Sequence, residues 1–301
     1  MKKMLFLFNP RSGKEQIKSH LLRILDIFSK AGYDIHVHVT QCQLDARKTV
    51  EHLGKNVDVI VCSGGDGTLN ETISGMLQLK KTPSLGYIPA GSTNDFASSL
   101  KLPLDVLEAT KNIIEGQPVP YDAGRFGGRV FSYVASFGAF TRTSYTTPQS
   151  IKNALGHTAY VLEGIQELTQ IRNEHIKMIV DGEVVEDDFL FGAICNSTSV
   201  GGVLTLDPDV VDLQDNKLEI LLVRAPRNLA ELHECILALQ DQTYNCAMLT
   251  FRSATHIRIF ADPEMPWTLD GEREDGHEHI TVVNKHLAYR LVQKPRESAD
   301  A

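Results

Sequence analysis

Residues 63–71 read SGGDGTLNE, and they directly follow an apolar, strand-like run at residues 57–62. Glycines at positions 64, 65 and 67 allow the backbone to turn sharply and to approach a ligand closely. A helical pattern continues from Leu69 to Gln78, so the N–H groups of a helix end would point into the loop. The stretch therefore predicts a phosphate site. The carboxylate of Asp66 beside phosphates indicates a metal ion, since like charges would otherwise repel. A plain strand-to-helix turn is the alternative.

About the first 120 residues alternate between strand-like and helix-like segments. Apolar runs predict strands at 4–8, 35–39, 57–62 and 84–88, and apolar spacing predicts helices at 14–31, 44–55 and 106–115. This alternation predicts a parallel sheet with helices on both faces. Ligands of such sheets bind at the carboxyl ends of the strands. Asn9, Thr40, residues 64–71 and residues 91–95 all follow strands, so we expect them to lie along one edge of the sheet.

The pattern changes near Tyr121, and the second half has the signature of antiparallel β-structure. Asp181-Gly182, between two strand-like runs, is a strong hairpin signal. Strands are predicted at 176–180, 189–195, 218–223, 257–260 and 280–283, and helices at 159–170 and 229–239. The second half is therefore expected to form a separate domain.

Two further loops carry groups that suit phosphate binding. Asn9-Pro10-Arg11-Ser12-Gly13 follows the first strand and opens the first helix, and its plainer interpretation is an ordinary helix cap. Residues 89–96 form a third turn with small hydroxyl side chains, in which Asn94 and Asp95 could simply cap the next helix.

The second half holds two acidic groups with more than one interpretation. Four carboxylates fall within nine residues, at Asp207, Asp209, Asp212 and Asp215. They suit Mg²⁺ or Ca²⁺, or they form a solvated acidic turn. The Asp270-Gly271-Glu272 segment could supply a general base, or it could be a hairpin turn.

Composition excludes several classes of protein. The 301 residues are 42% hydrophobic with a net charge of -8, which argues against a general nucleic-acid binder. No apolar stretch approaches the roughly 18 residues of a transmembrane span. The five cysteines have no CxxC spacing, so we expect reduced thiols in a cytoplasmic protein.

Taken in order, the motifs resemble those of the soluble bacterial diacylglycerol kinases, within the lipid kinase superfamily that includes sphingosine and ceramide kinases. The matching segments are 9–13, 64–71, 89–97, Asp122-x-Gly124, Ser136-Phe137-Gly138 and Asp270-Gly271-Glu272. The resemblance runs over roughly residues 2–293. This chain departs from the usual pattern in having Ser92 for Thr and Asn216 for Gly.

The resemblance implies an α/β fold of two domains. Residues 1–123 would form a doubly wound parallel-sheet nucleotide domain similar to those of NAD kinase and phosphofructokinase. Residues 124–283 would form an antiparallel β-sandwich that meets the lipid substrate, and about 284–296 would return to the first domain. ATP would bind in the cleft between the domains.

The resemblance also implies site residues. The expected nucleotide contacts are Asn9, Pro10, Arg11, Ser12, Gly13, Thr40, Gly64, Gly65, Asp66, Gly67, Thr68, Leu69, Asn70, Glu71 and Ser92. Asp66 and Asp122 would hold the catalytic Mg²⁺. A structural Mg²⁺ would take Asp215, with help from Asp212 and the carbonyl of Lys217. The base would come from Asp270 or Glu272.

These observations favour an ATP- and Mg²⁺-dependent lipid kinase, and they leave two alternatives. One is a kinase of related fold with a soluble acceptor, similar to NAD kinase. The other is a non-catalytic nucleotide-binding regulator. The expected partner is a diacylglycerol-like lipid met at the membrane surface. We expect no nucleic acid and no transmembrane span, and a cytoplasmic protein in peripheral contact with the inner face of the membrane. A homodimer is compatible with these patterns.

Overall fold

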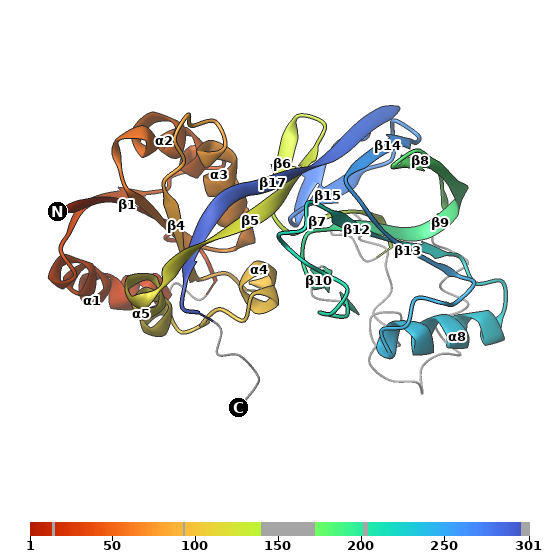
Figure 1. Cartoon of the computed structure of the whole chain (residues 1–301), viewed down its shortest axis with the longest axis horizontal. Helices are drawn as coiled ribbons and strands as arrows, with labels where there is room; N and C mark the ends of the chain where they lie inside the picture. The colour runs from red at the N-terminus through yellow and green to blue at the C-terminus, as the bar shows by residue number, and fades with distance from the viewer. Residues whose placement is uncertain (14–15, 93, 140–171, 201–203, 296–301) are drawn as a thin grey trace. The chain divides into compact units, whose positions relative to one another are not determined.

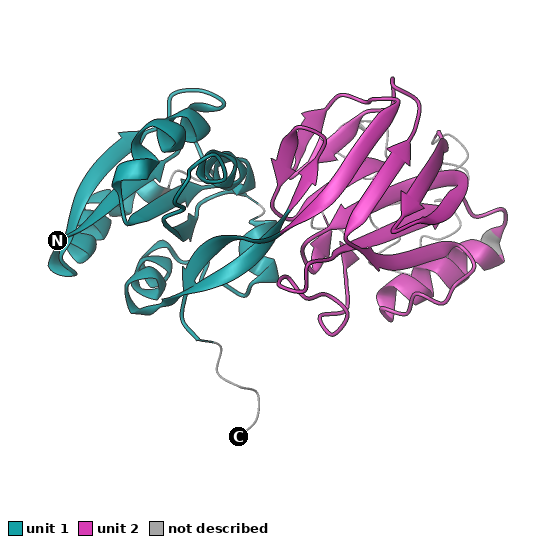
Figure 2. Cartoon of the chain, turned by 45° about the horizontal axis from the view of Figure 1, so that its top comes forward, with its two compact units in different colours: residues 1–123, 286–301 teal, residues 124–285 magenta. Residues whose placement is uncertain are grey.

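The computed structural model describes residues 1–13, 16–92, 94–139, 172–200 and 204–295. The chain divides into two compact units, which Figure 2 draws in different colours. Unit 1 comprises residues 1–123 and 286–301, and unit 2 comprises residues 124–285. Two strands, β5 (Gln117–Phe126) and β17 (His279–Gln293), contribute residues to both units.

Unit 1 is built on a parallel sheet, as predicted. Its strands run in the order β4-β3-β1-β2 and comprise β1 (Lys2–Phe8), β2 (Tyr33–Val39), β3 (Val59–Gly64) and β4 (Ser84–Pro89). The last part of β17 adds to this sheet, because Arg290 and Leu291 pair with β4 in parallel. Strands β1, β3 and β4 consist almost entirely of buried residues, which explains their continuous apolar runs.

Helices cover both faces of this sheet (Figure 1). On one face, α1 (Gln16–Lys30) and α5 (Val106–Glu115) pack on Phe6 and Val61 in one apolar cluster. On the other lie α2 (Asp45–Leu53) and α3 (Asp66–Met76), where a Cβ on Gly75 would lie 2.9 Å from the Val50 Cβ. Short elements complete the unit, namely η1 (Gly54–Asn56) and α4 (Asp95–Ser99).

Unit 2 is antiparallel in every strand pair whose register is given. Its strands comprise β6 (Arg129–Phe131), β7 (Val134–Gly138), β8 (Glu174–Val180), β9 (Glu183–Cys195), β12 (Leu218–Arg224), β13 (Leu249–Ala254), β14 (His256–Phe260), β15 (Trp267–Leu269) and β16 (Glu272–Glu274). A separate ribbon pairs β10 (Ser199–Val200) with β11 (Leu204–Thr205), and α8 spans Leu229–Gln240.

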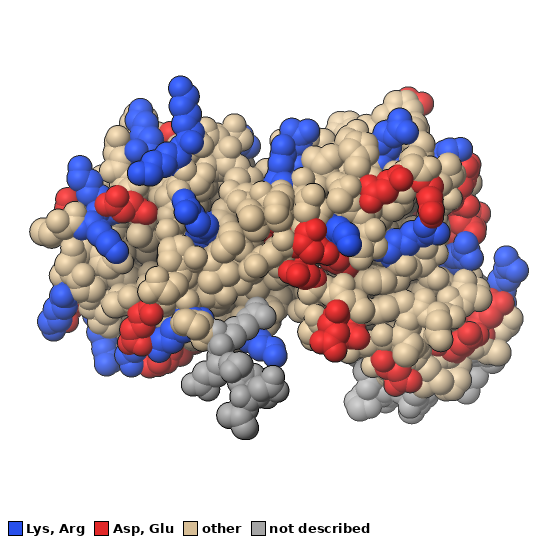
Figure 3. Space-filling view, in the orientation of Figure 1, with Lys and Arg blue, Asp and Glu red and all other residues tan. Residues whose placement is uncertain are grey.

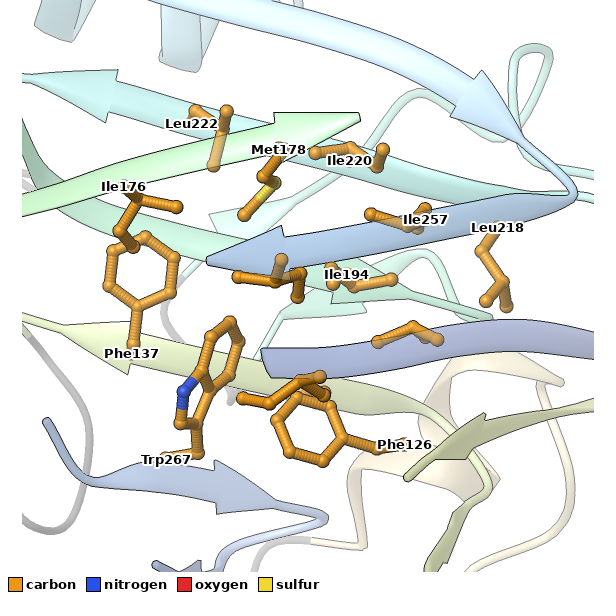
Figure 4. Packing of buried hydrophobic residues seen from close by; sticks show 14 of the residues in the cluster. Phe126, Phe137, Ile176, Met178, Ile194, Leu218, Ile220, Leu222, Ile257 and Trp267 are labelled. Atoms are coloured by element: carbon orange, nitrogen blue, oxygen red, sulfur yellow. The ribbon is translucent and has the colours of Figure 1, made fainter. Parts of the chain in front are cut away.

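The long strand β9 organises the core of unit 2. Its first half pairs with β8, and its second half pairs with β7 and β12. One strand therefore belongs to two parts of the sheet, and residues from both parts pack in one apolar cluster. Trp267 lies in this core against Phe126 and Phe137, with ring centroids 4.8 and 4.9 Å away (Figure 4). Such tilted and edge-to-face aromatic contacts add stability beyond the area that they bury.

Several sequence predictions need correction in their bounds. The helix expected from Leu69 begins at Asp66, because Gly64 and Gly65 complete the turn before it. The helix expected at 44–55 ends at Leu53, and the strand expected at 280–283 is part of the longer β17. The hairpin at Asp181-Gly182 is confirmed, with φ angles of 46° and 97°. The helix expected at 159–170 lies outside the described residues. Four of the five free cysteines are buried, and Cys42 is exposed.

Candidate active site

The glycine loop joins β3 to α3 in unit 1. Gly65 occupies the N-cap position with extended backbone, and Asp66, Gly67 and Thr68 form the first turn of the helix. A Cβ on Gly64 would lie 2.6 Å from the Thr68 Cβ, so only glycine fits there. The N–H groups at the N-terminus of a helix are the usual means by which proteins bind phosphate.

Three strand-end loops meet at this helix end, as the sequence predicted. The Asn9 N–H donates to the Ser63 carbonyl at 2.9 Å, and the Ala90 N–H donates to the Gly64 carbonyl at 2.9 Å. The Asn9 side chain also reaches the Thr68 hydroxyl, at 3.4 Å. The loops at 9–13, 64–71 and 89–96 are thus linked through their own backbones.

Two glycines allow this close packing. Gly13 has φ +52°, and a Cβ there would lie 2.4 Å from the Ala90 carbonyl oxygen. A Cβ on Gly91 would lie 2.6 Å from the Gly65 Cα. The facing surfaces of the loops are therefore backbone, which is what close approach to a phosphate requires.

The Asp66 carboxylate is directed at the third loop. It accepts hydrogen bonds from the Asp95 N–H at 3.2 Å and the Phe96 N–H at 3.3 Å, at the start of α4. Asn94, in the left-handed conformation, binds Gly91 N–H at 2.8 Å through its side-chain oxygen. From the sequence, Asn94 or Asp95 was expected to cap this helix. Asp66 caps it instead, and its distance in sequence from α4 explains why the sequence did not reveal this role.

Glu71 has a structural role that the motif does not reveal. Its carboxylate accepts hydrogen bonds from the Leu44 N–H at 2.7 Å and the Ala46 N–H at 3.2 Å. The acid therefore stabilises the N-terminus of α2, where Leu44 is in the left-handed conformation. Thr40, also expected at the nucleotide, continues the β1–β2 pairing by donating its N–H to the Phe8 carbonyl at 3.0 Å.

Asp122 is fully buried where β5 leaves unit 1. It accepts a hydrogen bond from the Leu287 N–H at 2.7 Å, and its Oδ1 is 3.1 Å from the His286 Nδ1. Leu287 has φ +47°, so the carboxylate holds an unfavourable backbone conformation in β17.

The Asp270-Gly271-Glu272 segment forms a tight hairpin between β15 and β16 in unit 2. Asp270 and Gly271 have φ angles of 48° and 82°, and Leu269 pairs with Glu272 across the turn. Asp270 is buried, whereas Glu272 is exposed. Burial raises the pKa of Asp270, and hydrogen bonds from Ser132, Val134 and Tyr133 oppose the rise.

The acidic loop of unit 2 is a series of local turns. The Asp212 carboxylate accepts from the Gln214 N–H at 2.9 Å, and the Asp215 carboxylate accepts from the Lys217 N–H at 2.9 Å. Asn216 has φ +67°, a conformation that asparagine tolerates better than most residues. Among the described residues, no three His, Cys, Asp or Glu side chains are grouped as a metal site. The metal roles of Asp122, Asp212, Asp215 and Lys217 therefore stay predictions.

Charge on the surface is mixed. Basic and acidic side chains both occur on the face of each unit drawn in Figure 3. In the part of the chain that the structure describes, no helix has the length and apolar character needed to cross a membrane.

Comparisons with known proteins cover nearly the whole chain. The family model of the diacylglycerol kinase catalytic domain matches residues 3–126, and that of the YegS C-terminal NAD kinase beta sandwich-like domain matches residues 134–286. The diacylglycerol kinase of Bacillus subtilis (strain 168) is 34% identical over 275 residues, which cover 90% of each chain. The diacylglycerol kinase of Staphylococcus carnosus is also 34% identical, over 90% of this chain and 89% of that one.

A solved structure supports the fold. The crystal structure of a diacylglycerol kinase from Bacillus anthracis matches with a TM-score of 0.78 and 26% identity, over 98% of both chains. The predicted fold class, a parallel α/β domain with a β-sandwich-like domain, is confirmed.

Proposed function

Because this chain belongs to the bacterial diacylglycerol kinase family and is a lipid kinase, we propose that it transfers the γ-phosphoryl group of ATP to a hydroxyl of diacylglycerol or a related lipid, with Mg²⁺. The resemblance found in the sequence is thereby confirmed, and a kinase family implies the use of ATP. The convergence of three strand-end loops on the N-terminus of α3 carries the proposal, because such helix ends bind phosphate groups.

The nucleotide phosphates are assigned to the loops at 9–13 and 64–68, with Ser92 on the third loop. Backbone N–H groups at the start of α3 would bind phosphate oxygens and fix their orientation. Asn9 links two of the loops through Thr68, so it positions them as well. Glu71 is given a supporting role, because its carboxylate holds α2.

Two magnesium sites are part of the proposal. The catalytic ion is assigned to Asp66 and Asp122, and a structural ion to Asp212, Asp215 and the Lys217 carbonyl. These donor sets fit Mg²⁺, which prefers carboxylate and carbonyl oxygens. When bound, Mg²⁺ would offset the negative charge that spreads over the transferred phosphoryl group.

Glu272 is the proposed general base. It is exposed at the end of a rigid two-residue hairpin, where a substrate hydroxyl can approach its carboxylate. It would accept the hydroxyl proton as the oxygen attacks the γ-phosphorus, while the bond from the γ-phosphorus to the bridging oxygen breaks and ADP leaves. A carboxylate suffices for this because little proton transfer need precede a loose transition state.

The acceptor lipid lies in a membrane, so the chain would contact the inner face of that membrane peripherally, where cytoplasmic ATP is available.

The soluble-acceptor and regulator alternatives make different predictions from a lipid kinase. The purified chain is incubated with γ-labelled ATP and Mg²⁺, with micelles of diacylglycerol, phosphatidylglycerol, ceramide or undecaprenol in parallel with NAD. We expect label in a lipid. Label in NAD alone would favour the first alternative, and ATP binding without any transfer the second.

The matched variants are Glu272→Gln and Glu264→Gln, each of which replaces an exposed glutamate of unit 2. Replacing Glu272 should lower kcat by about 100-fold, whereas replacing Glu264 should leave kcat within about twofold. Equal effects of the two substitutions would contradict the assignment of the base.

A further inference from the structure

We propose that Asp270 is a positioning residue, whose carboxylate fixes the hairpin that carries Glu272; this rests on the function proposed above. Asp270 follows β15 and Glu272 begins β16, so the two lie on either side of Gly271. A change in the orientation of Asp270 therefore moves Glu272 through only one intervening residue.

Both oxygens of the Asp270 carboxylate accept hydrogen bonds from protein donors. Oδ2 accepts from the Ser132 N–H at 2.6 Å and the Ser132 hydroxyl at 2.7 Å. Oδ1 accepts from the Tyr133 N–H and the Val134 N–H, both at 3.0 Å. An ionised carboxylate has about four acceptor positions, and these bonds use all of them. Asp270 therefore has no lone pair to spare for a substrate proton.

The anchor of these bonds is a rigid part of unit 2. Ser132 is fully buried, and Val134 begins β7, which pairs with both β9 and β15. The Asp270 N–H donates to the Val134 carbonyl at 2.9 Å, so the backbone and the side chain of Asp270 both bind Val134. The hairpin is therefore attached to the central ladder immediately before Glu272.

The backbone conformation explains why the attachment is needed. Positive φ at Asp270 and Gly271 describes a two-residue turn that aspartate-glycine sequences favour. Strand β16 has only three residues and lies at the end of the strand order, so its ladder alone gives little support. The four bonds to Asp270 hold the start of the hairpin, and the Arg129–Glu274 ion pair holds its far end.

Another hairpin of unit 2 offers a matched control. Asp181 also precedes glycine at positive φ, and its carboxylate accepts from the Thr255 N–H at 3.1 Å and the His256 N–H at 2.9 Å. Asp181→Asn weakens the same kind of anchor in a hairpin without Glu272. Any loss of activity that comes from general loosening of unit 2 should appear in this variant as well.

The test compares Asp270→Asn, Asp181→Asn, Glu272→Gln and the double variant Asp270→Asn/Glu272→Gln in the full chain. Asparagine places an NH₂ group against donors that need an acceptor. We expect Asp270→Asn to lower kcat by about 100-fold with little change in KM for ATP, and Asp181→Asn to leave kcat within about twofold. In the Glu272→Gln background, Asp270→Asn should lower kcat by no more than a further twofold or so, because its effect passes through Glu272.

Two other measurements separate the possible outcomes. The shape of the kcat/KM pH profile should change in Glu272→Gln and stay that of the unchanged protein in Asp270→Asn; the reverse would make Asp270 the base and overturn the proposal. Amide hydrogen exchange at residues 272–274 should be faster by about tenfold in Asp270→Asn than in the unchanged protein. Unchanged exchange would overturn the proposal. Exchange needs no substrate, so it tests the role of Asp270 even if every lipid acceptor fails and the proposed function is wrong.

Discussion

The Asp66 carboxylate accepts a hydrogen bond from the Phe96 N–H at 3.3 Å, across 30 residues of sequence. The acid of the glycine loop thus caps α4 and fixes the third loop against the first turn of α3. Asp122 and Asp270 act similarly, since each buried carboxylate accepts backbone N–H groups from a distant segment. The acids of these motifs hold the backbone of the site together, in addition to any metal or proton that they bind.

We predict that Asp66→Asn lowers kcat by about 100-fold or more while the protein stays folded. The amide keeps one acceptor oxygen, so the free energy of unfolding should fall by only about 1 kcal/mol. Ser99→Ala is the control, because it removes a 2.9 Å hydrogen bond within α4 and leaves the carboxylate unchanged. Steady-state kinetics and thermal unfolding check both variants. A folded Asp66→Asn protein with normal turnover would remove Asp66 from the reaction.

Gly13→Ala should weaken ATP binding. The new Cβ would lie 2.4 Å from the Ala90 carbonyl oxygen and would occupy a backbone conformation with φ +52°. The first loop must then move away from the third, and we expect KM for ATP to rise about tenfold. Gly32→Ala shares the positive φ, at +84°, but its Cβ meets nothing within 4 Å. It should lose about 1 kcal/mol of stability with no change in KM. A similar KM in the two variants would mean that loop contact is unimportant.

Asp122 distinguishes support of the backbone from a role in metal binding. Asp122→Asn keeps an oxygen for the Leu287 N–H, whereas Asp122→Ala removes the 2.7 Å acceptor of that N–H and empties the buried position of the carboxylate. We expect Asp122→Ala to lower the free energy of unfolding by about 1–3 kcal/mol and Asp122→Asn to change it little. If Asp122 also binds Mg²⁺, Asp122→Asn should still raise the Mg²⁺ concentration needed for half-maximal activity. Titration of Mg²⁺ against activity, beside urea unfolding, checks both expectations. Normal Mg²⁺ dependence in Asp122→Asn would restrict Asp122 to its structural role.

The strand ends of unit 1 were predictable from sequence because buried parallel strands have continuous apolar runs. Glycines mark the turns that follow them, so the meeting of Asn9, Gly64 and Gly91 at one edge followed from the order of strands and helices. The partners of Asp66, Glu71 and Asp270 were not predictable. Each carboxylate binds backbone N–H groups whose sequence carries no signal, since every residue except proline has one. The sequence also could not show that Asp270 is buried and Glu272 exposed. Strand β16 has only three residues, which is too short for an alternating pattern to predict burial.

Glu219 is a buried acid that the proposed reaction does not use. It lies on β12, opposite Cys195 of β9 and Ser253 of β13, and its side chain is only 1% exposed. Burial raises its pKa to about 8, and the charge of Asp215 adds to the shift. Ser253 and Lys217 lower the pKa without reversing that rise.

The raised pKa of Glu219 makes the stability of the protein depend on pH. Below its ordinary pKa of 4.5, folded and unfolded chains both carry the proton, so folding costs nothing at this site. Between pH 4.5 and about 8 only the folded chain holds the proton, so stability falls as pH rises and then levels off. Glu219→Gln removes this term. In Mg²⁺-free buffer, its advantage in free energy of unfolding should be about 1 kcal/mol at pH 5 and roughly 4 kcal/mol at pH 8. Urea titrations of the unchanged protein and of Glu219→Gln in parallel over this pH range check the expectation. A pH-independent difference for Glu219→Gln would show that Glu219 titrates normally in the folded protein.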